Sequence, residues 1–129
     1  MQFEFEDAEV ASCQLDRSVL TVRLSAALVV QEHGERGWMP LTLRLEGVAE
    51  WAVLHRQESF TPAIAGRLRG GVAIGSGGER LRRVPVPSRL GGGWRLELEG
   101  AQGHLCQWQG EVLEVLVPAQ CSTVQAYQC

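Results

Sequence analysis

Residues 19–30 read Val19-Leu20-Thr21-Val22-Arg23-Leu24-Ser25-Ala26-Ala27-Leu28-Val29-Val30. Alternate side chains from the second position onward are apolar: Leu20, Val22, Leu24, Ala26, Leu28 and Val30. The positions between them include Thr21, Arg23 and Ser25. A period of two is typical of a β-strand with one buried and one solvent-facing side. The pattern therefore predicts a long, half-buried strand.

The alternation continues on both sides of this strand. Residues 33–37 have the composition of a turn, and residues 41–46 (Leu-Thr-Leu-Arg-Leu-Glu) alternate again. These two alternating segments predict a long β-hairpin. Residues 3–15 are expected to add one or two further strands.

The second half of the chain repeats this signal in shorter segments. Residues 94–99, 104–109 and 111–117 alternate, with a Gly-rich turn and Gly110 between them, and they predict a three-strand antiparallel meander. Residues 84–87 (Val-Pro-Val-Pro) lack two amide donors, which predicts an edge strand or an extended connector. Residues 48–60 fit either a strand, which the preceding alternation favours, or a short helix.

Short strands separated by glycine and proline predict an all-β fold. A chain of 129 residues that is 45% hydrophobic suits one domain, so residues 1–129 are expected to form a single antiparallel sandwich or barrel with Gly-rich loops and at most one short helix. The longest apolar run, residues 26–30, is too short for a membrane helix. The acidic first residues do not resemble an export signal, so we expect a cytoplasmic protein without membrane contact.

Charge composition excludes several classes of function. The net charge is −3, which argues against a general nucleic-acid-binding protein. All twelve basic residues are arginine. Without lysine the chain cannot perform Schiff-base chemistry or form a Walker-type phosphate loop.

One Gly-rich segment, residues 70–78, superficially suggests phosphate binding. Gly75 and Gly77 start a G-x-G pattern, but Arg80 stands where the third glycine belongs, and no convincing helix follows. A flexible hairpin tip is the preferred interpretation.

Opposite charges gather in two separate segments. Residues 1–16 contain five acids and no arginine, whereas residues 67–89 contain six arginines and only one acid. Arg80, Arg82 and Arg83 are therefore candidates for binding an acidic partner or another anionic ligand. In the alternative interpretation the basic segment lies against the acidic N-terminal strand of the same molecule.

The cysteines give no sign of a metal site. Cys13, Cys106, Cys121 and Cys129 are irregularly spaced, without a C-x-x-C pair, so we expect neither a metal nor a required disulfide. His104 and Cys106 would share one face of a strand and could touch. Trp108 follows on the same face, which favours a packed core over chemistry. We therefore nominate no catalytic residue, no metal ligand and no cofactor.

The four tryptophans fall into two groups, of which Trp38 and Trp51 flank the second half of the predicted hairpin. Trp94 and Trp108 lie in the predicted meander and are expected in the core. Trp38 stands beside Gly37 near a turn and is expected to be exposed, where it could anchor a protein interface.

Several segments of the first half are similar to a known class of protein. The opening Phe5-Glu6-Asp7-Ala8-Glu9-Val10, the long strand 18–30 and residues 41–48 resemble small all-β bacterial domains, among them immunity proteins of polymorphic toxin systems. Many members carry histidine where this chain has Glu6, and the second half does not share the resemblance. The resemblance implies a protein that binds and blocks a toxin without chemistry of its own.

Three functions remain open at this point. The leading expectation is a non-enzymatic, cytoplasmic binding domain of immunity type, with Arg80, Arg82, Arg83 and Trp38 facing a protein partner. The first alternative is a small-ligand- or anion-binding β-barrel, with or without enzymatic activity, whose pocket is lined by tryptophan and arginine. The second is a structural subunit that associates with itself through exposed strand edges, as a homo-oligomer.

Overall fold

The computed structural model describes residues 1–49 and 64–118, and 71% of these residues lie in strands. The strands are β1 (Gln2–Asp16), β2 (Val19–Val30), β3 (Arg36–Glu46), β4 (Gly66–Gly75), β5 (Arg80–Leu81), β6 (Arg83–Pro85), β7 (Ser88–Leu90), β8 (Trp94–Gly100), β9 (Leu105–Gly110) and β10 (Val112–Leu116). The predicted all-β antiparallel class is confirmed. Residues 50–63 lie outside the described part of the chain. The choice between strand and helix for residues 48–60 and the position of Trp51 therefore stay predictions.

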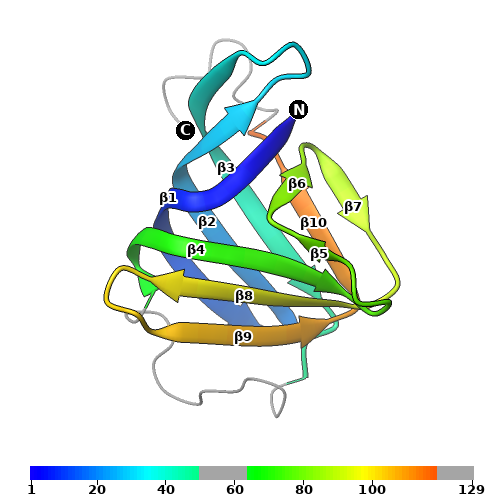
Figure 1. Ribbon diagram of the computed structural model, residues 1–129. Helices are drawn as coiled ribbons and strands as arrows, with labels where there is room; N and C mark the ends of the chain where they lie inside the picture. Colours follow the sequence, from blue (N-terminus) through cyan, green and yellow to red (C-terminus); the bar gives the residue numbers. More distant parts are fainter. Residues whose placement is uncertain (50–63, 119–129) are drawn as a thin grey trace.

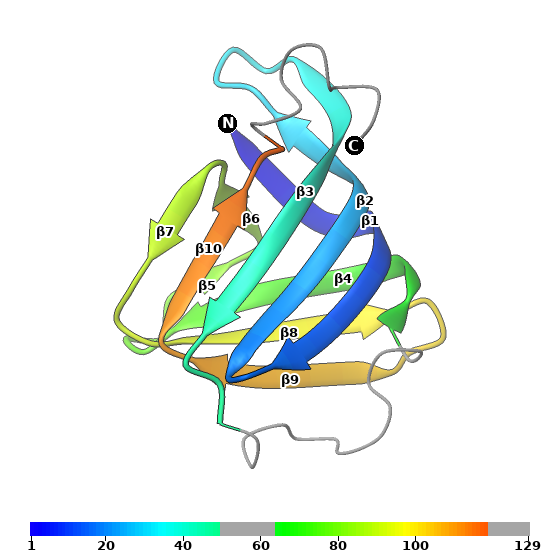
Figure 2. The same cartoon turned by 180° about the vertical axis from the view of Figure 1, so that it is seen from behind.

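All ten strands belong to one sheet, which is not closed. The strand order is β7-β10-β3-β2-β1-β4-β8-β9, with β5 beside β4 and β6 beside β1. The sheet folds over on itself, so that β4, β8 and β9 cross the layer made by β1, β2, β3 and β10 (Figures 1 and 2). This arrangement has the features of both a sandwich and an open barrel.

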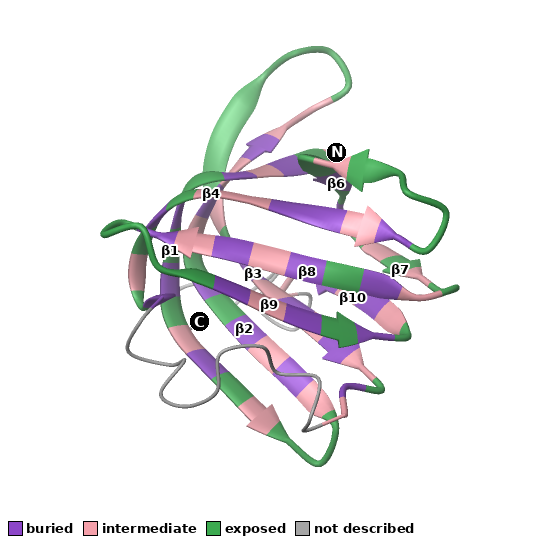
Figure 3. Cartoon of the chain, turned by 60° about the horizontal axis from the view of Figure 1, so that its bottom comes forward, coloured by how far each residue is buried: buried purple, intermediate pink, exposed green. Residues whose placement is uncertain are grey.

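The side chains that face inward from the two layers form one hydrophobic cluster. Buried and exposed positions alternate along the strands, as the period of two predicts (Figure 3). Trp94 and Trp108 are 6% and 1% exposed, which confirms their predicted place in the core. Complete burial of a large apolar side chain contributes about 1.5–3 kcal/mol, so this cluster is the main source of stability.

The predicted core face of residues 19–30 is correct only for its first half. Leu24 pairs with Leu41, but the next pair is Ala27 with Met39, so two residues of β2 stand opposite Pro40 alone. This is a β-bulge, which suits proline because it cannot donate a hydrogen bond to the neighbouring strand. Beyond the bulge Ala27 and Val29 are buried, and Ala26, Leu28 and Val30 turn to the outer side.

The predicted meander is wrong in its last strand. β8 and β9 pair as expected, but β10 pairs with β3 and β7 instead of β9. The chain changes layers at Gly110, where the amide of Glu111 donates to the carbonyl of Glu46 over 2.7 Å. A β-carbon on Gly110 would lie 2.6 Å from Cγ of Leu45 and 2.8 Å from the carbonyl oxygen of Glu46. Only glycine allows β9 to approach β3 this closely.

β1 is a single bent strand and covers the residues for which one or two strands were expected. Its pairing with β2 jumps from Glu4–Leu28 to Glu9–Ala26, and Asp7 within the jump has φ +69°. Aspartate is among the few residues other than glycine that adopt this conformation readily. The bend lets the first half of β1 pair with β6 and its middle pair with β4.

The close approach at Gly110 yields a stability prediction. Gly110→Ala should lower the free energy of unfolding by about 1–3 kcal/mol, because the new methyl group overlaps Leu45 and the β3 backbone. Gly37→Ala is the matched control, since Gly37 also lies in a strand and has no atom within 4 Å of the added carbon. Urea denaturation of both variants measures the difference, and equal unfolding free energies would contradict this account of the layer crossing.

Candidate functional site

Strand register brings an arginine and an exposed tryptophan into one row on the outer surface. Arg83 of β6 pairs with Glu4 of β1, Glu4 pairs with Leu28 of β2, and Leu28 pairs with Trp38 of β3. Residues that pair directly in antiparallel strands point to the same side of the sheet. We call Arg83, Glu4, Leu28 and Trp38 the cross-strand row.

The apolar end of the cross-strand row is open to solvent. Trp38 is 56% exposed, as predicted, and it is one of two large hydrophobic side chains exposed among the described residues. Leu28 stands opposite it, and Val30 lies diagonally from it on the same outer side, both half-buried. Because the bulge opposite Pro40 turns Leu28 and Val30 outward, this apolar patch was not visible in the alternation of the sequence.

At the other end of the cross-strand row the sheet contains a gap. β1 pairs with β4 only at Glu9–Arg67 and Val10–Gly66. Farther along, β5 pairs with β4 at residues 73–74, and β6 pairs with β1 at residues 2–4. In the interval, residues 5–8 of β1 and residues 68–72 of β4 do not pair with each other, and no other described strand lies between them. Arg82 lies in the chain between β5 and β6.

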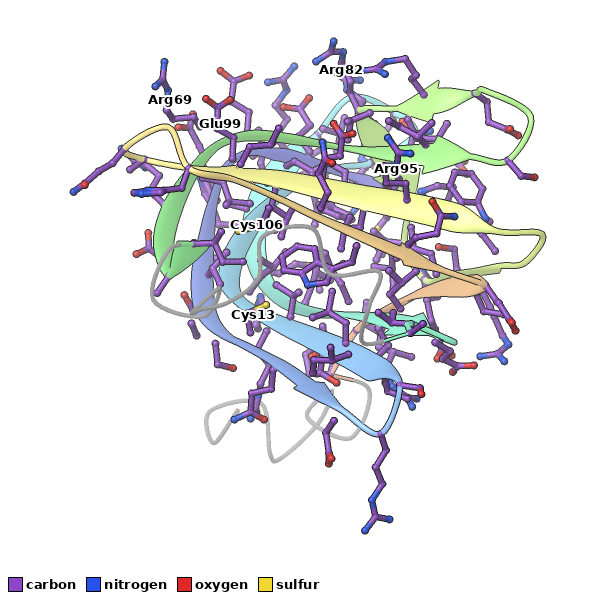
Figure 4. The ribbon with its side chains drawn as sticks, turned by 90° about the horizontal axis from the view of Figure 1, so that it is seen from below. Cys13, Arg69, Arg82, Arg95, Glu99 and Cys106 are labelled. Carbon is purple, nitrogen blue, oxygen red and sulfur yellow. The ribbon has the colours of Figure 1, made fainter. Side chains whose placement is uncertain are left out.

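This gap forms a groove of about 340 Å³. Its lining combines three arginines, two glutamates and two glycines: Arg69, Arg82, Arg83, Glu4, Glu6, Gly70 and Gly71. Arg69 and Arg82 project from the outer side of the molecule, away from the core (Figure 4). The tryptophan-lined pocket of the first alternative does not correspond to this groove, because its described lining contains no aromatic side chain.

The charges in the groove are unequally paired. Arg83 and Glu4 form an ion pair at 2.7 Å, and Arg69 lies 3.9 Å from Glu99. Within the described part of the chain, no acidic oxygen lies within 4 Å of the Arg82 guanidinium. Glu6, on the opposite wall, likewise has no ion pair there. Among the described residues, the groove therefore contains one cation, Arg82, and one anion, Glu6, without an ion pair.

Other arginines of segment 67–89 form ion pairs within the fold, and the alternative interpretation expected those with the acidic N-terminal strand. Arg67 lies 3.8 Å from Asp7 of the N-terminal strand. Arg89 donates to both carboxylate oxygens of Glu46 at 3.2 Å and also to Glu114. This hydrogen bonding lowers the pKa of Glu46 and raises that of Arg89. The alternative interpretation therefore holds for Arg67 and Arg83, which pair with Asp7 and Glu4 of the N-terminal strand. Arg80 and Arg82 have no ion pair in the described ranges, and their role in binding a partner stays a prediction.

The Gly-rich segment is a strand and a tight turn. Residues 70–75 belong to β4, so the expected hairpin tip is limited to residues 76–79. The Gly75 amide donates to the carbonyl of Glu79 and the Gly78 amide to that of Gly75. β5 follows, and with no helix N-terminus here this segment lacks the usual features of a phosphate loop.

His104 and Cys106 do not form a catalytic pair. β9 begins at Leu105, so the alternation does not extend to His104, which is exposed in the preceding turn. Cys106 is 4% exposed, and burial raises the pKa of its thiol. Cys13 is fully buried, and this burial, followed by the influence of Cys106, raises the pKa of Cys13 to about 12. Both thiols lie between the two layers (Figure 4).

The buried thiols should be chemically inert in the folded protein, because only a thiolate reacts rapidly. In a variant with Cys121→Ser and Cys129→Ser, we expect Cys13 and Cys106 to react with an aromatic disulfide reagent at pH 8 more than about 100-fold slower than free cysteine. Addition of denaturant should release both thiols at once. Rapid reaction of either thiol in the native protein would contradict the burial of this pair.

The described residues contain no group of three or more His, Cys, Asp or Glu side chains placed to hold a metal ion. In the same residues, no helix is long and apolar enough to span a membrane. Comparison of the chain with protein-family models, curated proteins and solved structures finds no match.

Of the four nominated partner-binding residues, the fold brings Trp38 and Arg83 into one row and places Arg82 in the adjoining groove. Arg80 lies on β5, opposite Ile74. The alternative interpretation placed the acidic N-terminal strand against the basic segment, but the sequence did not reveal the groove that Glu4, Glu6 and Gly70 line. The gap that forms this groove depends on pairing between distant strands. Gly70 did carry a signal, since a glycine inside a strand often marks a close approach by another molecule.

Proposed function

We propose that the protein is a non-enzymatic binding domain that recognises a protein partner through the cross-strand row and the adjoining groove. The observation that carries this proposal is the register that aligns exposed Trp38 and Leu28 with Glu4 and Arg83 on one outer face. An aromatic anchor beside arginine and a polar rim is the usual composition of a protein interface.

The more specific form of the proposal is an immunity-type protein that neutralises a toxin in the cytoplasm. Its support is the resemblance of residues 5–10, 18–30 and 41–48 to that class. Arg80 and Arg82, which have no ion pair among the described residues, add a physical argument. They would attract an acidic partner and accelerate association, an effect that added salt would weaken.

Self-association is the second candidate, and one observation favours it. β9 lies at the end of the strand order and carries Leu105, which is 43% exposed. An edge strand of this kind can pair with a second copy. The two candidates place the essential hydrophobic side chain on different strands, so one experiment separates them.

The test uses, as the candidate partner, the product of the gene adjacent to the one that encodes this protein. If it binds, Trp38→Ala should weaken the affinity at least about 30-fold, which is the loss of a hot-spot residue worth about 2 kcal/mol. Leu105→Ala is the matched control and should bind as the wild type does. Surface plasmon resonance gives the affinities, and sedimentation velocity gives the oligomeric state.

Two results would contradict the proposal. One is unchanged affinity of Trp38→Ala for a partner that the wild type binds. The other is a stable homo-oligomer that Leu105→Ala dissociates, which would establish self-association as the function of the exposed hydrophobic surface.

A further inference from the structure

Gly70 is a glycine that the fold itself does not require. Its φ lies outside the left-handed region, and a β-carbon built on it would meet no atom within 4 Å. The adjacent Gly71 is different, because its β-carbon would lie 2.9 Å from both Phe5 Cγ and the carbonyl oxygen of Glu97. The register of β4 against β8 shifts between Leu68 and Gly70, but neither the φ of Gly70 nor a neighbouring atom requires glycine there. Glycine inside a strand lowers stability, so its presence at position 70 calls for a further explanation.

The position of Gly70 supplies that explanation. Gly70 lines the groove, in the part of β4 where the described chain places no strand on the side toward β1. An uncovered strand edge offers amide and carbonyl groups to an added extended segment. The missing side chain leaves room for another main chain to approach that edge.

Charge indicates what kind of segment fits. Arg82 lines the same groove without an acidic partner in the described residues, and a guanidinium binds a carboxylate through two parallel hydrogen bonds. Glu4 is paired with Arg83, so Glu6 is the acid of the lining that has no ion pair in the described residues. Glu6 would repel a polyanion such as a nucleic acid, whereas a protein segment with one carboxylate and an otherwise neutral main chain meets little repulsion.

We propose that the groove between β1 and β4 holds an extended acidic segment of the protein partner, whose main chain passes over Gly70 and whose carboxylate binds Arg82. This inference rests on the proposed protein-binding function and names the chemistry that the partner must present. Trp38 anchors the partner at one end of the cross-strand row, and the groove selects for an acidic side chain at the other.

The test is a titration of the ¹⁵N-labelled protein, followed by NMR, with a capped pentapeptide that has one central glutamate. We expect amide shifts concentrated in residues 69–72 and 82–83, and binding about tenfold weaker for the same peptide with glutamine. Gly70→Val should abolish these shifts while leaving the melting temperature equal or higher, because valine suits a strand better than glycine does.

The arginine is tested against a matched control. Arg82→Ala should weaken peptide binding about tenfold. Arg23→Ala should leave binding unchanged, since Arg23 is also exposed and without an ion pair in the described residues but lies on β2, away from the groove lining.

Three results would overturn the inference. They are the absence of groove shifts with the glutamate peptide, unchanged binding by Gly70→Val, and binding of inorganic phosphate that equals or exceeds that of the peptide. The outcome also separates this inference from the proposed function. A partner that requires Trp38 but binds Gly70→Val like the wild type would remove the groove from the interface and leave the protein-binding function intact.

Discussion

The bend of β1 at Asp7 is the constraint on which the rest of the structure depends. A single sheet can enclose a core only if a strand passes from one layer to the other, and β1 does so by changing neighbours along its length. Phe5 and Ala8, on either side of the bend, are both buried, so the bend does not interrupt the core. Asp7 makes the turn in a positive-φ conformation and places its carboxylate 3.8 Å from Arg67 at the start of β4.

The candidate site is a consequence of this bend. Since β1 pairs with β6 before the bend and with β4 after it, the edges of β1 and β4 diverge in between and leave the groove. Phe5 packs beneath Gly71, where an added β-carbon would lie 2.9 Å from its Cγ, so this part of the groove lining rests directly on the core. Most of the charged side chains at the rim of the groove lie on strands, and Arg82 lies in the one-residue connection between β5 and β6. Sites held by paired strands keep their geometry well, which suits recognition of a particular partner.

Sequence patterns predicted local structure well and long-range pairing poorly. The hairpin of β2 and β3, the pair β8–β9 and the burial of Trp94 and Trp108 follow from local alternation, and all were correct. The partner of β10 was missed because it depends on Gly110, whose role appears only when β9 meets β3. The outward orientation of Leu28 was not predicted. Pro40 could have indicated a bulge, but the effect of that bulge on Leu28 depends on the register in which β3 pairs with β2.

The same limit applies to the site. Exposure of Trp38 and the excess of arginine in residues 67–89 could be predicted, and they identified two ends of one surface. The sequence could not distinguish Arg83, which pairs with Glu4, from Arg82, which has no such pair in the described chain. That distinction depends on the register in which β6 pairs with β1, which places Arg83 opposite Glu4.

Native-state hydrogen exchange tests the central claim most directly, because it reports whether each backbone amide has a stable hydrogen bond. If the sheet is open between β1 and β4, the amides of residues 5–8 and 68–72 that face the gap should exchange at rates typical of turns. The amides of β4 that face β8 should stay protected. A bound acidic segment should slow the exchange of the amides that face the gap. Slow exchange of every amide in residues 68–72 of the free protein would show a continuous sheet there and contradict the account.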